Sequence, residues 1–407
     1  NITLDQTAPV LAEVTAVPLL DNDSTPNYIF SSTETGTLSY GGSCSSATTQ
    51  ANENNNTITL NTLAEGTYDN CTLSVTDSAV NISDNLSFTT FTVDLTTPAL
   101  SLVSAVSTYT NDTTPNLTFS SSENGTISYG GSCSSSTTQA ISGNNVVTLS
   151  TLTEGIYDNC TISVVDGAGN LSGALTVDNF TVDVTSPTLS LGSPSSSLTK
   201  SGPVTFTVSY TGASTVSLST DNVTVTSTDN ASAGSTSVSG SGTGTRTVTL
   251  SNLTGDGTLS ISLASGTASD EAGNQALSAG PSSSFTVDNS GPPGTVAIAK
   301  EVQNTDNTTT LTLTLTASDN ATVSAYYVGD NSTQPTSSQF TALSSPATAF
   351  SDNISYSLAG SGTRTVYAWF MDPLANITST PVTATTLAEN TAPTLSSVSL
   401  SSTGSDP

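Results

Sequence analysis

The chain has 407 residues and carries 32 acidic side chains against 4 basic ones, with no histidine and a net charge of -28. This balance excludes nucleic acid and anionic membrane surfaces as partners, because both are bound through patches of Lys and Arg. It favours cations, and no apolar run is long enough for membrane insertion of this segment.

The N-terminal half is a tandem repeat. Residues 9–97 and 98–186 align without a gap at a period of 89 residues, so that Tyr68–Cys71, for example, recurs as Tyr157–Cys160. A repeat of this length, with so little divergence, predicts two domains of one fold placed one after the other.

The C-terminal half diverges but keeps the same frame. Each unit ends in an acidic residue followed shortly by Pro, and each carries Asp-x-x-x-Asn about 12 to 18 residues before that acid. The frame predicts domains at 9–97, 98–186, 187–291 and 292–392. Residues 1–8 then read as the end of a preceding repeat or a linker, and residues 393–407 as the first strand of a following domain or a donor strand.

Strand signals run along every unit. Thr310–Thr316 and Val204–Val208 alternate apolar and polar residues strictly, which places one face of a strand in a core and the other in water. Turn residues such as Glu123-Asn124-Gly125 recur every 8 to 12 residues, and no apolar run has the helical period. We therefore expect an all-β chain of tandem immunoglobulin-like Greek-key β-sandwiches with about seven strands each, in an extended array.

Two local patterns support sandwiches. Leu63-x-x-Gly66-x-Tyr68 and its repeat at Leu152–Tyr157 fit a tyrosine corner, in which the phenol hydroxyl bonds back to the chain; the alternative is an ordinary core tyrosine. The four cysteines form two pairs at a spacing of 27 residues, one pair in each repeat: Cys44 with Cys71 and Cys133 with Cys160. We expect a disulfide within each domain, and hence an oxidising compartment, rather than pairs of buried thiols.

A longer motif resembles the immunoglobulin-like tandem-repeat domains of large bacterial surface adhesins and extracellular fibre proteins. In the second repeat it consists of Gly155, Tyr157, Val164, Asp166, Gly169, Asn170 and Ser172, then Phe180-Thr181-Val182-Asp183 and Pro187. The fourth unit departs most, with Asp372-Pro373-Leu374-Ala375-Asn376 and with Glu389 in place of the final Asp. The resemblance implies a surface or secreted stalk and, in some relatives, calcium bound between domains.

An enzyme is not expected. Without histidine there is no Ser-His-Asp triad, and zinc or copper sites lack their usual ligands. Paired carboxylates suit a glycosidase, but these acids recur in every unit, which fits a structural role better than one active site.

The repeated acids instead predict Ca²⁺ as a bound ion. In stacked sandwiches, the chain exit of one unit meets the loops of the next, and carboxylates without Lys or Arg partners then need a hard cation with oxygen ligands. Alternatively, the Asp and Asn residues only form Asx-turns and cap loops. The candidate ligands are Asp94, Asp166, Asn170, Asp183, Asp270, Asn274, Asp288, Asp372, Asn376, Asp23 and Asp112, and Glu65, Glu123, Asp256 and Asp319 are expected at the same junctions.

Twenty of the 31 asparagines lie in Asn-x-Ser/Thr, which is either a consequence of composition or the mark of a glycoprotein. Two functions follow from all these features. The chain is a cell-surface stalk or adhesin array, whose host or surface ligand is bound by a domain outside this segment, or it is a subunit of a self-assembling extracellular filament. In a filament the partners are copies of the chain itself, joined for example by strand addition.

Overall fold

The structure is a computed structural model that describes residues 4–304 and 308–388. Within these ranges every regular element is a β-strand, apart from the 3₁₀ turns η1 (Thr220–Asn222) and η2 (Ser337–Gln339). The all-β prediction is confirmed. The segment 393–407, expected as a first or donor strand, lies outside the described residues, as do residues 1–3.

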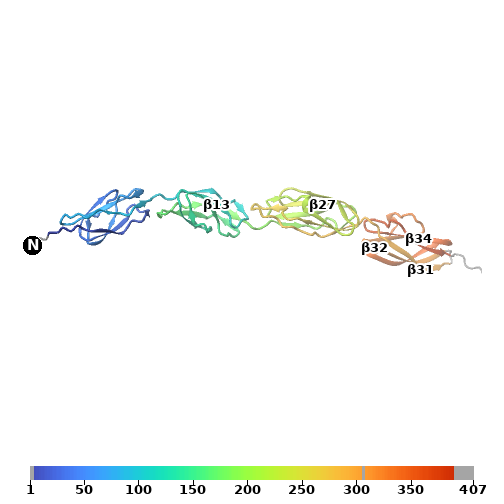
Figure 1. Cartoon of the computed structure of the whole chain (residues 1–407). Helices are drawn as coiled ribbons and strands as arrows, with labels where there is room; N and C mark the ends of the chain where they lie inside the picture. The colour runs from blue at the N-terminus through green and yellow to red at the C-terminus, as the bar shows by residue number, and fades with distance from the viewer. Residues whose placement is uncertain (1–3, 305–307, 389–407) are drawn as a thin grey trace, which may run out of the picture. The chain divides into compact units, whose positions relative to one another are not determined.

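Two compact units make up the chain, Asn1–Thr185 and Ser186–Pro407, and each contains two separate hydrophobic cores. Figure 1 shows the β-sandwiches that surround these cores. Nowhere in the described ranges is there a helix with the length and apolarity needed to cross a membrane.

The first sandwich has ten short strands. They are β1 (Leu11–Thr15), β2 (Leu20–Asp21), β3 (Asn27–Ser32), β4 (Gly36–Gly41), β5 (Gln50–Ala51), β6 (Asn54–Thr59), β7 (Gly66–Tyr68), β8 (Thr72–Thr76), β9 (Leu86–Ser87) and β10 (Phe91–Val93). The sheets have the orders β1-β3-β6, β5-β4-β8-β9 and β2-β10-β7, so strands distant in sequence are neighbours, as in a Greek key. Phe30, Leu73 and Phe91, one from each sheet, are fully buried in one core.

The second sandwich repeats this topology. Its strands are β11 (Leu100–Ser104), β12 (Tyr109–Thr110), β13 (Asn116–Ser121), β14 (Gly125–Gly130), β15 (Gln139–Ala140), β16 (Gly143–Thr148), β17 (Gly155–Tyr157), β18 (Thr161–Val165), β19 (Leu175–Thr176) and β20 (Phe180–Val182). The equivalent core positions hold Phe119, Ile162 and Phe180, so the 89-residue period of the sequence is also the period of the packing.

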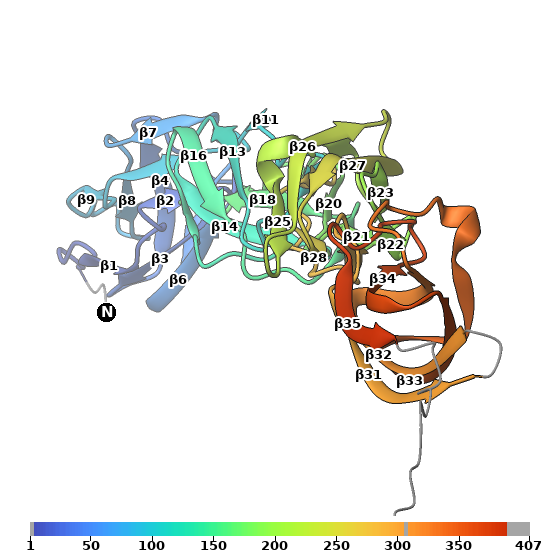
Figure 2. The same ribbon diagram turned by 90° about the vertical axis from the view of Figure 1, so that its right-hand side faces the viewer.

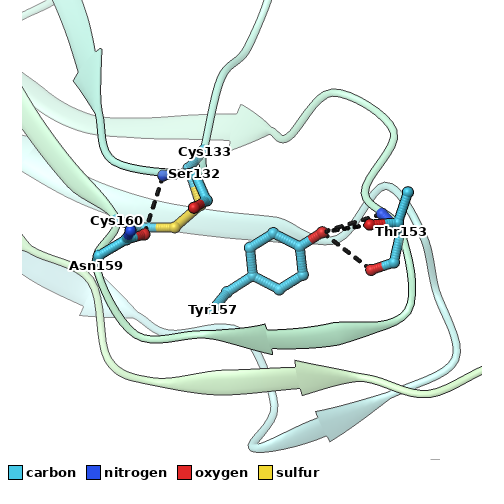
Figure 3. Close-up of a disulfide and its surroundings, with 6 residues drawn as sticks. All are labelled: Ser132, Cys133, Thr153, Tyr157, Asn159 and Cys160. Atoms are coloured by element: carbon cyan, nitrogen blue, oxygen red, sulfur yellow. Dashed lines mark hydrogen bonds between the residues drawn. A yellow bond between two sulfur atoms is a disulfide. The ribbon is translucent and has the colours of Figure 1, made fainter.

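Both predicted disulfides are formed, Cys44–Cys71 and Cys133–Cys160. Each ties the loop after β4 or β14 to the residue just before β8 or β18. The tyrosine corner is confirmed as well, and Figure 3 shows it beside the second disulfide. The Tyr157 hydroxyl donates to the Thr153 carbonyl at 2.9 Å and accepts from the Thr153 N–H at 3.0 Å, and Tyr68 donates to the Ala64 carbonyl at 2.9 Å.

The third sandwich is built from longer strands: β21 (Thr188–Leu191), β22 (Leu198–Thr199), β23 (Val204–Thr211), β24 (Thr215–Val216), β25 (Val223–Ser227), β26 (Ser232–Ser239), β27 (Thr245–Thr254), β28 (Gly257–Leu263), β29 (Ala268–Ser269) and β30 (Phe285–Val287). Its sheets have the orders β21-β23-β27-β26, β22-β30-β28-β25 and β24-β29. Val204, Phe206 and Val208, whose alternation predicted this strand, point into the core from β23.

None of the sandwiches has the expected number of about seven strands: the first three have ten each, and the fourth has fewer in its described residues. Its described residues form five, namely β31 (Gly294–Gln303), β32 (Thr308–Gly329), β33 (Thr341–Ala359), β34 (Gly362–Met371) and β35 (Val382–Ala388). The first part of β32 pairs with β31 and β33, and residues 325–329 pair with β34. Figure 2 labels these strands. The register with β33 shifts between Ser318 and Val323. Across this shift β32 ends its pairing with β31 and begins its pairing with β34, while it stays paired with β33.

The tyrosine corner predicts a specific loss of stability. Tyr157→Phe removes both hydrogen bonds from a side chain that is 8% exposed, so we expect the second sandwich to lose about 1–2 kcal/mol. Scanning calorimetry of the full chain measures this as a lower melting temperature for one transition. Tyr109→Phe, on an exposed ring, is the matched control, and an equal effect of both variants would contradict a role for the corner.

Candidate metal centre

The Asp-x-x-x-Asn motif is a closed loop in all four sandwiches. The Asp directly follows a strand (β8, β18, β29 or β34), and its N–H donates to the carbonyl of the Asn at 3.1 Å in every copy. In return the Asn backbone N–H donates to the Asp Oδ1, at 2.9 Å from Asn81, Asn170 and Asn274 and at 2.8 Å from Asn376. These bonds form the capped loop that was the alternative to metal binding.

The Asn side chain does more than close its own loop. Its Nδ2 donates to the Asp Oδ2 of the loop and also to the backbone carbonyl of the acidic residue that ends the preceding repeat. We call this second bond the Asn clasp. It joins Asn81 to Asp5 at 3.3 Å, Asn170 to Asp94 at 2.9 Å and Asn376 to Asp288 at 3.1 Å. For Asp94 with Asn170 and for Asp288 with Asn376 the sequence predicted that the residues meet, but not that a carbonyl is the contact. The contact between Asn81 and Asp5 was not predicted.

Three groups of carboxylates gather around the clasps. They are Asp5, Glu34 and Asp77; Asp94, Glu123 and Asp166; and Asp288, Asp319 and Asp372, and in each group one oxygen from every member lies within 4.8 Å of the others. Glu123 and Asp319 occupy the junctions for which they were expected. The group at Asp5 was missed, although each of its members precedes a member of the second group by one period of 89 residues.

In the second group the central carboxylate is well supplied with hydrogen bonds. Asp166 Oδ1 accepts the N–H groups of Ala168, Gly169 and Asn170 at 2.8–2.9 Å. Burial acts to raise the pKa of Asp166, but these bonds and that of the Asn170 amide together lower it. Partial burial and the charges of Asp94 and Asp166 raise the pKa of Glu123.

The third group is more deeply buried. Asp288 and Asp372 are 0% and 1% exposed, and the Oδ2 atoms of Asp288 and Asp319 are buried without a hydrogen-bond partner. Burial, followed by the nearby carboxylates of Asp372 and Asp319, raises the pKa of Asp288 to about 7. Burial and then the charge of Asp372 raise the pKa of Asp319 to about 6.

The remaining predicted ligands lie elsewhere or stay predictions. Asp23 and Asp112 accept the N–H groups of Thr25 and Thr114 at 2.8 Å, as Asx-turns do, and are not members of a carboxylate group. Asp183 belongs to one compact unit, whereas Asp270 and Asn274 belong to the other, so their grouping remains a prediction.

Oxygen is the only donor type in these groups, which suits a hard cation such as Ca²⁺ and not zinc or copper. The third group fits such an ion best, because its unpartnered buried oxygens are available as ligands. Asp288, Asp319 and Asp372 would supply the carboxylates, and a bound ion would neutralise charges that nothing else in the group offsets.

The chain matches no known family model and no curated protein. Among solved structures it is similar to FdeC, an Escherichia coli adhesin, with 14% identity, coverage of 70% of this chain and 95% of that chain, and a TM-score of 0.28. It is also similar to the D1–D4 ectodomain fragment of ICAM-5, with 12% identity, coverage of 94% and 99%, and a TM-score of 0.25. At these values the similarity carries no argument about function.

The raised pKa values predict how stability depends on pH when a chelator is present. The folded chain holds protons on Asp288 and Asp319 more tightly than the unfolded chain, so their contribution is complete below about pH 4 and is lost as the pH rises through 6 and 7. We expect the melting temperature, followed by the fluorescence of the single Trp369, to fall between pH 5 and pH 8. Asp319→Asn should flatten this slope, and an unchanged slope would contradict the assignment.

Proposed function

We propose that this chain is part of a non-enzymatic extracellular stalk, a repeat array that projects from a cell surface. The observation that carries the proposal is the recurring Asn clasp. The buried amide of Asn170 or Asn376 holds the acidic residue at the end of one repeat, Asp94 or Asp288, against the Asp-x-x-x-Asn loop of the next. A chain that only needed independent domains has no use for this repeated contact.

The junctions are also short and closely packed. In the second unit Thr378 Oγ1 donates to the Pro292 carbonyl at 2.8 Å, and Asn320 Nδ2 donates to the Val287 carbonyl at 3.1 Å. A Cβ on Gly291 would lie 2.1 Å from the Ile377 backbone, so this linker position requires glycine. In the first unit Gly167 and Gly169 lie against Leu20 and Asn22. Such contacts restrict bending between the two sandwiches of each unit, which is what a stalk requires.

The internal cross-links support an extracellular location. Disulfides persist in oxidising compartments, and the first two sandwiches carry one each. A glycan coat stays a prediction, but two of the predicted Asn-x-Ser/Thr sites are excluded from it. Asn170 and Asn376 are 8% and 4% exposed and use their amides in the clasps, so they are not acceptors for a glycan.

Solution scattering tests the stalk. Strands of seven or eight residues with their loops give about 40 Å for each sandwich, so four in line would reach roughly 160 Å. We expect a maximum dimension near that value and a constant molecular mass over a concentration series. A radius of gyration near 22 Å, as for a compact 400-residue globule, would contradict the proposal. Mass that grows with concentration, with filaments in electron micrographs, would favour the filament instead.

The same measurement isolates the clasp. Asn170→Ala removes the clasp between the first two sandwiches, and the scattering curve should then indicate greater flexibility than that of the parent chain. Asn179→Ala replaces an exposed asparagine of the same sandwich and serves as the matched control. Equal curves for the two variants would show that the clasp does not set the junction.

A further inference from the structure

The Asp372 carboxylate, in the group with Asp288 and Asp319, receives fewer hydrogen bonds than its counterpart Asp166 in the first unit. Asp166 accepts from two N–H groups inside its loop, those of Ala168 and Gly169, besides those of Asn170. In the fourth sandwich the equivalent residues are Leu374 and Ala375, and the Ala375 N–H donates to the Asp372 backbone carbonyl at 3.2 Å, not to its carboxylate. The hydrogen bonds found for the Asp372 carboxylate come from Asn376 alone, through its backbone N–H and its amide.

Burial makes this shortage costly. A fully buried Asp288 has one oxygen without a partner, and so has Asp319, and the side-chain oxygen of Asn376 is buried without a partner as well. Native proteins rarely leave buried polar atoms unpaired, and such atoms call for an ion, a water or a proton. Three such oxygens at one junction form an independent sign of a ligand, beyond the clustering of the acids.

No basic residue offsets the charge. Across the described residues the one salt bridge joins Arg364 to Asp330, away from this group, and Arg246 donates to the carbonyls of Thr245 and Val216. Burial in the presence of like charges, without a counter-charge, strongly disfavours three ionised carboxylates.

The third acid of this group, Asp319, differs from its counterparts in length and in its place in the fold. Glu34 and Glu123 occupy the corresponding position after β3 and β13, in loops, whereas Asp319 sits at the register shift of the continuous strand β32. Beside it lies an open hollow of about 360 Å³ lined by Asp256, Ser290, Pro293, Ser318, Asp319 and Asn320. The hollow gives an ion a route from solvent to Asp319 and offers further oxygens along its wall.

We propose that Asp288, Asp319 and Asp372 bind one Ca²⁺ ion, which locks the fourth sandwich onto the third. Carboxylates from three separate elements, with hydroxyl and amide oxygens beside them, match the six to eight flexible oxygen ligands of Ca²⁺ better than the rigid octahedron of Mg²⁺. The ligands come from the end of β30, the bend of β32 and the end of β34, so the ion spans the junction. This inference does not depend on the stalk, since a filament subunit would use the same ion.

Calorimetric titration of the full chain with CaCl₂ at pH 8, after treatment with a chelator, tests the site. We expect binding with a stoichiometry of one for the tightest class of sites. Tb³⁺ provides a readout that is local to this site. Trp369 is the one tryptophan of the chain, and it lies on β34, three residues before Asp372. Excitation of Trp369 should sensitise Tb³⁺ emission, and added Ca²⁺ should quench that emission.

Matched variants distinguish this junction from the other one. Asp319→Asn should weaken Ca²⁺ binding at least tenfold and abolish the Trp369-sensitised signal, while Glu123→Gln, at the equivalent position of the second sandwich, should leave both unchanged. Asp319→Asn should also melt no lower than the parent chain in chelator at pH 8, because it removes one of three repelling charges. Asp372→Asn provides a second variant if the first does not fold.

Three results would overturn the proposal. The first is the absence of both calorimetric heat and sensitised emission in the parent chain. The second is an equal loss of binding in Glu123→Gln and Asp319→Asn. The third is binding of Mg²⁺ as tight as that of Ca²⁺, which would point to an ion that keeps its water shell.

Discussion

The junctions depend on the two protons of one asparagine amide. In each clasp one proton goes to the carboxylate of the Asp four residues earlier, and the other goes to the backbone carbonyl that ends the preceding repeat. Aspartate at this position would have no proton to donate, and a longer glutamine would place its amide elsewhere. Loop closure and the contact between sandwiches are therefore a single interaction, so the loop cannot open without loss of the junction.

This arrangement also explains why acids crowd at each junction. The amide of the clasp donates to a carbonyl just after the last strand of the preceding repeat, and the residue that carries this carbonyl is itself acidic, as in Asp94 and Asp288. The loop needs its own Asp to hold the Asn, and a third acid comes from the loop after β13 or from within β32. Three carboxylates thus come together because each belongs to a different part of the same joint.

Local features of the fold were predictable from sequence, and features that depend on burial were not. Alternation located β23 and β32, the cysteine spacing located both disulfides, and Gly-x-Tyr located the corner at Tyr157, because each pattern specifies its structure over a few residues or one repeat. The five long strands of the fourth sandwich were not expected, since the strict alternation of Thr310–Thr316 covers only part of β32, which continues to Gly329. At the joints, sequence indicated which acids meet but not their burial, and burial separates Asp288 from Asp94.

The magnitudes show why these two joints differ in kind. Two unit charges 4.8 Å apart repel by about 1 kcal/mol in water but by about 3–4 kcal/mol at an effective dielectric constant of 20. Half-exposed Asp94 and Glu123 stay near the value for water, because salt screens the repulsion between exposed charges. The N–H groups of Ala168 and Gly169 further stabilise the negative charge of Asp166. Asp288 and Asp372 are shielded from water and lack those donors, so they approach the larger value. Deeper burial and the loss of two loop N–H donors thus distinguish a junction held by hydrogen bonds from one that requires a proton or a cation.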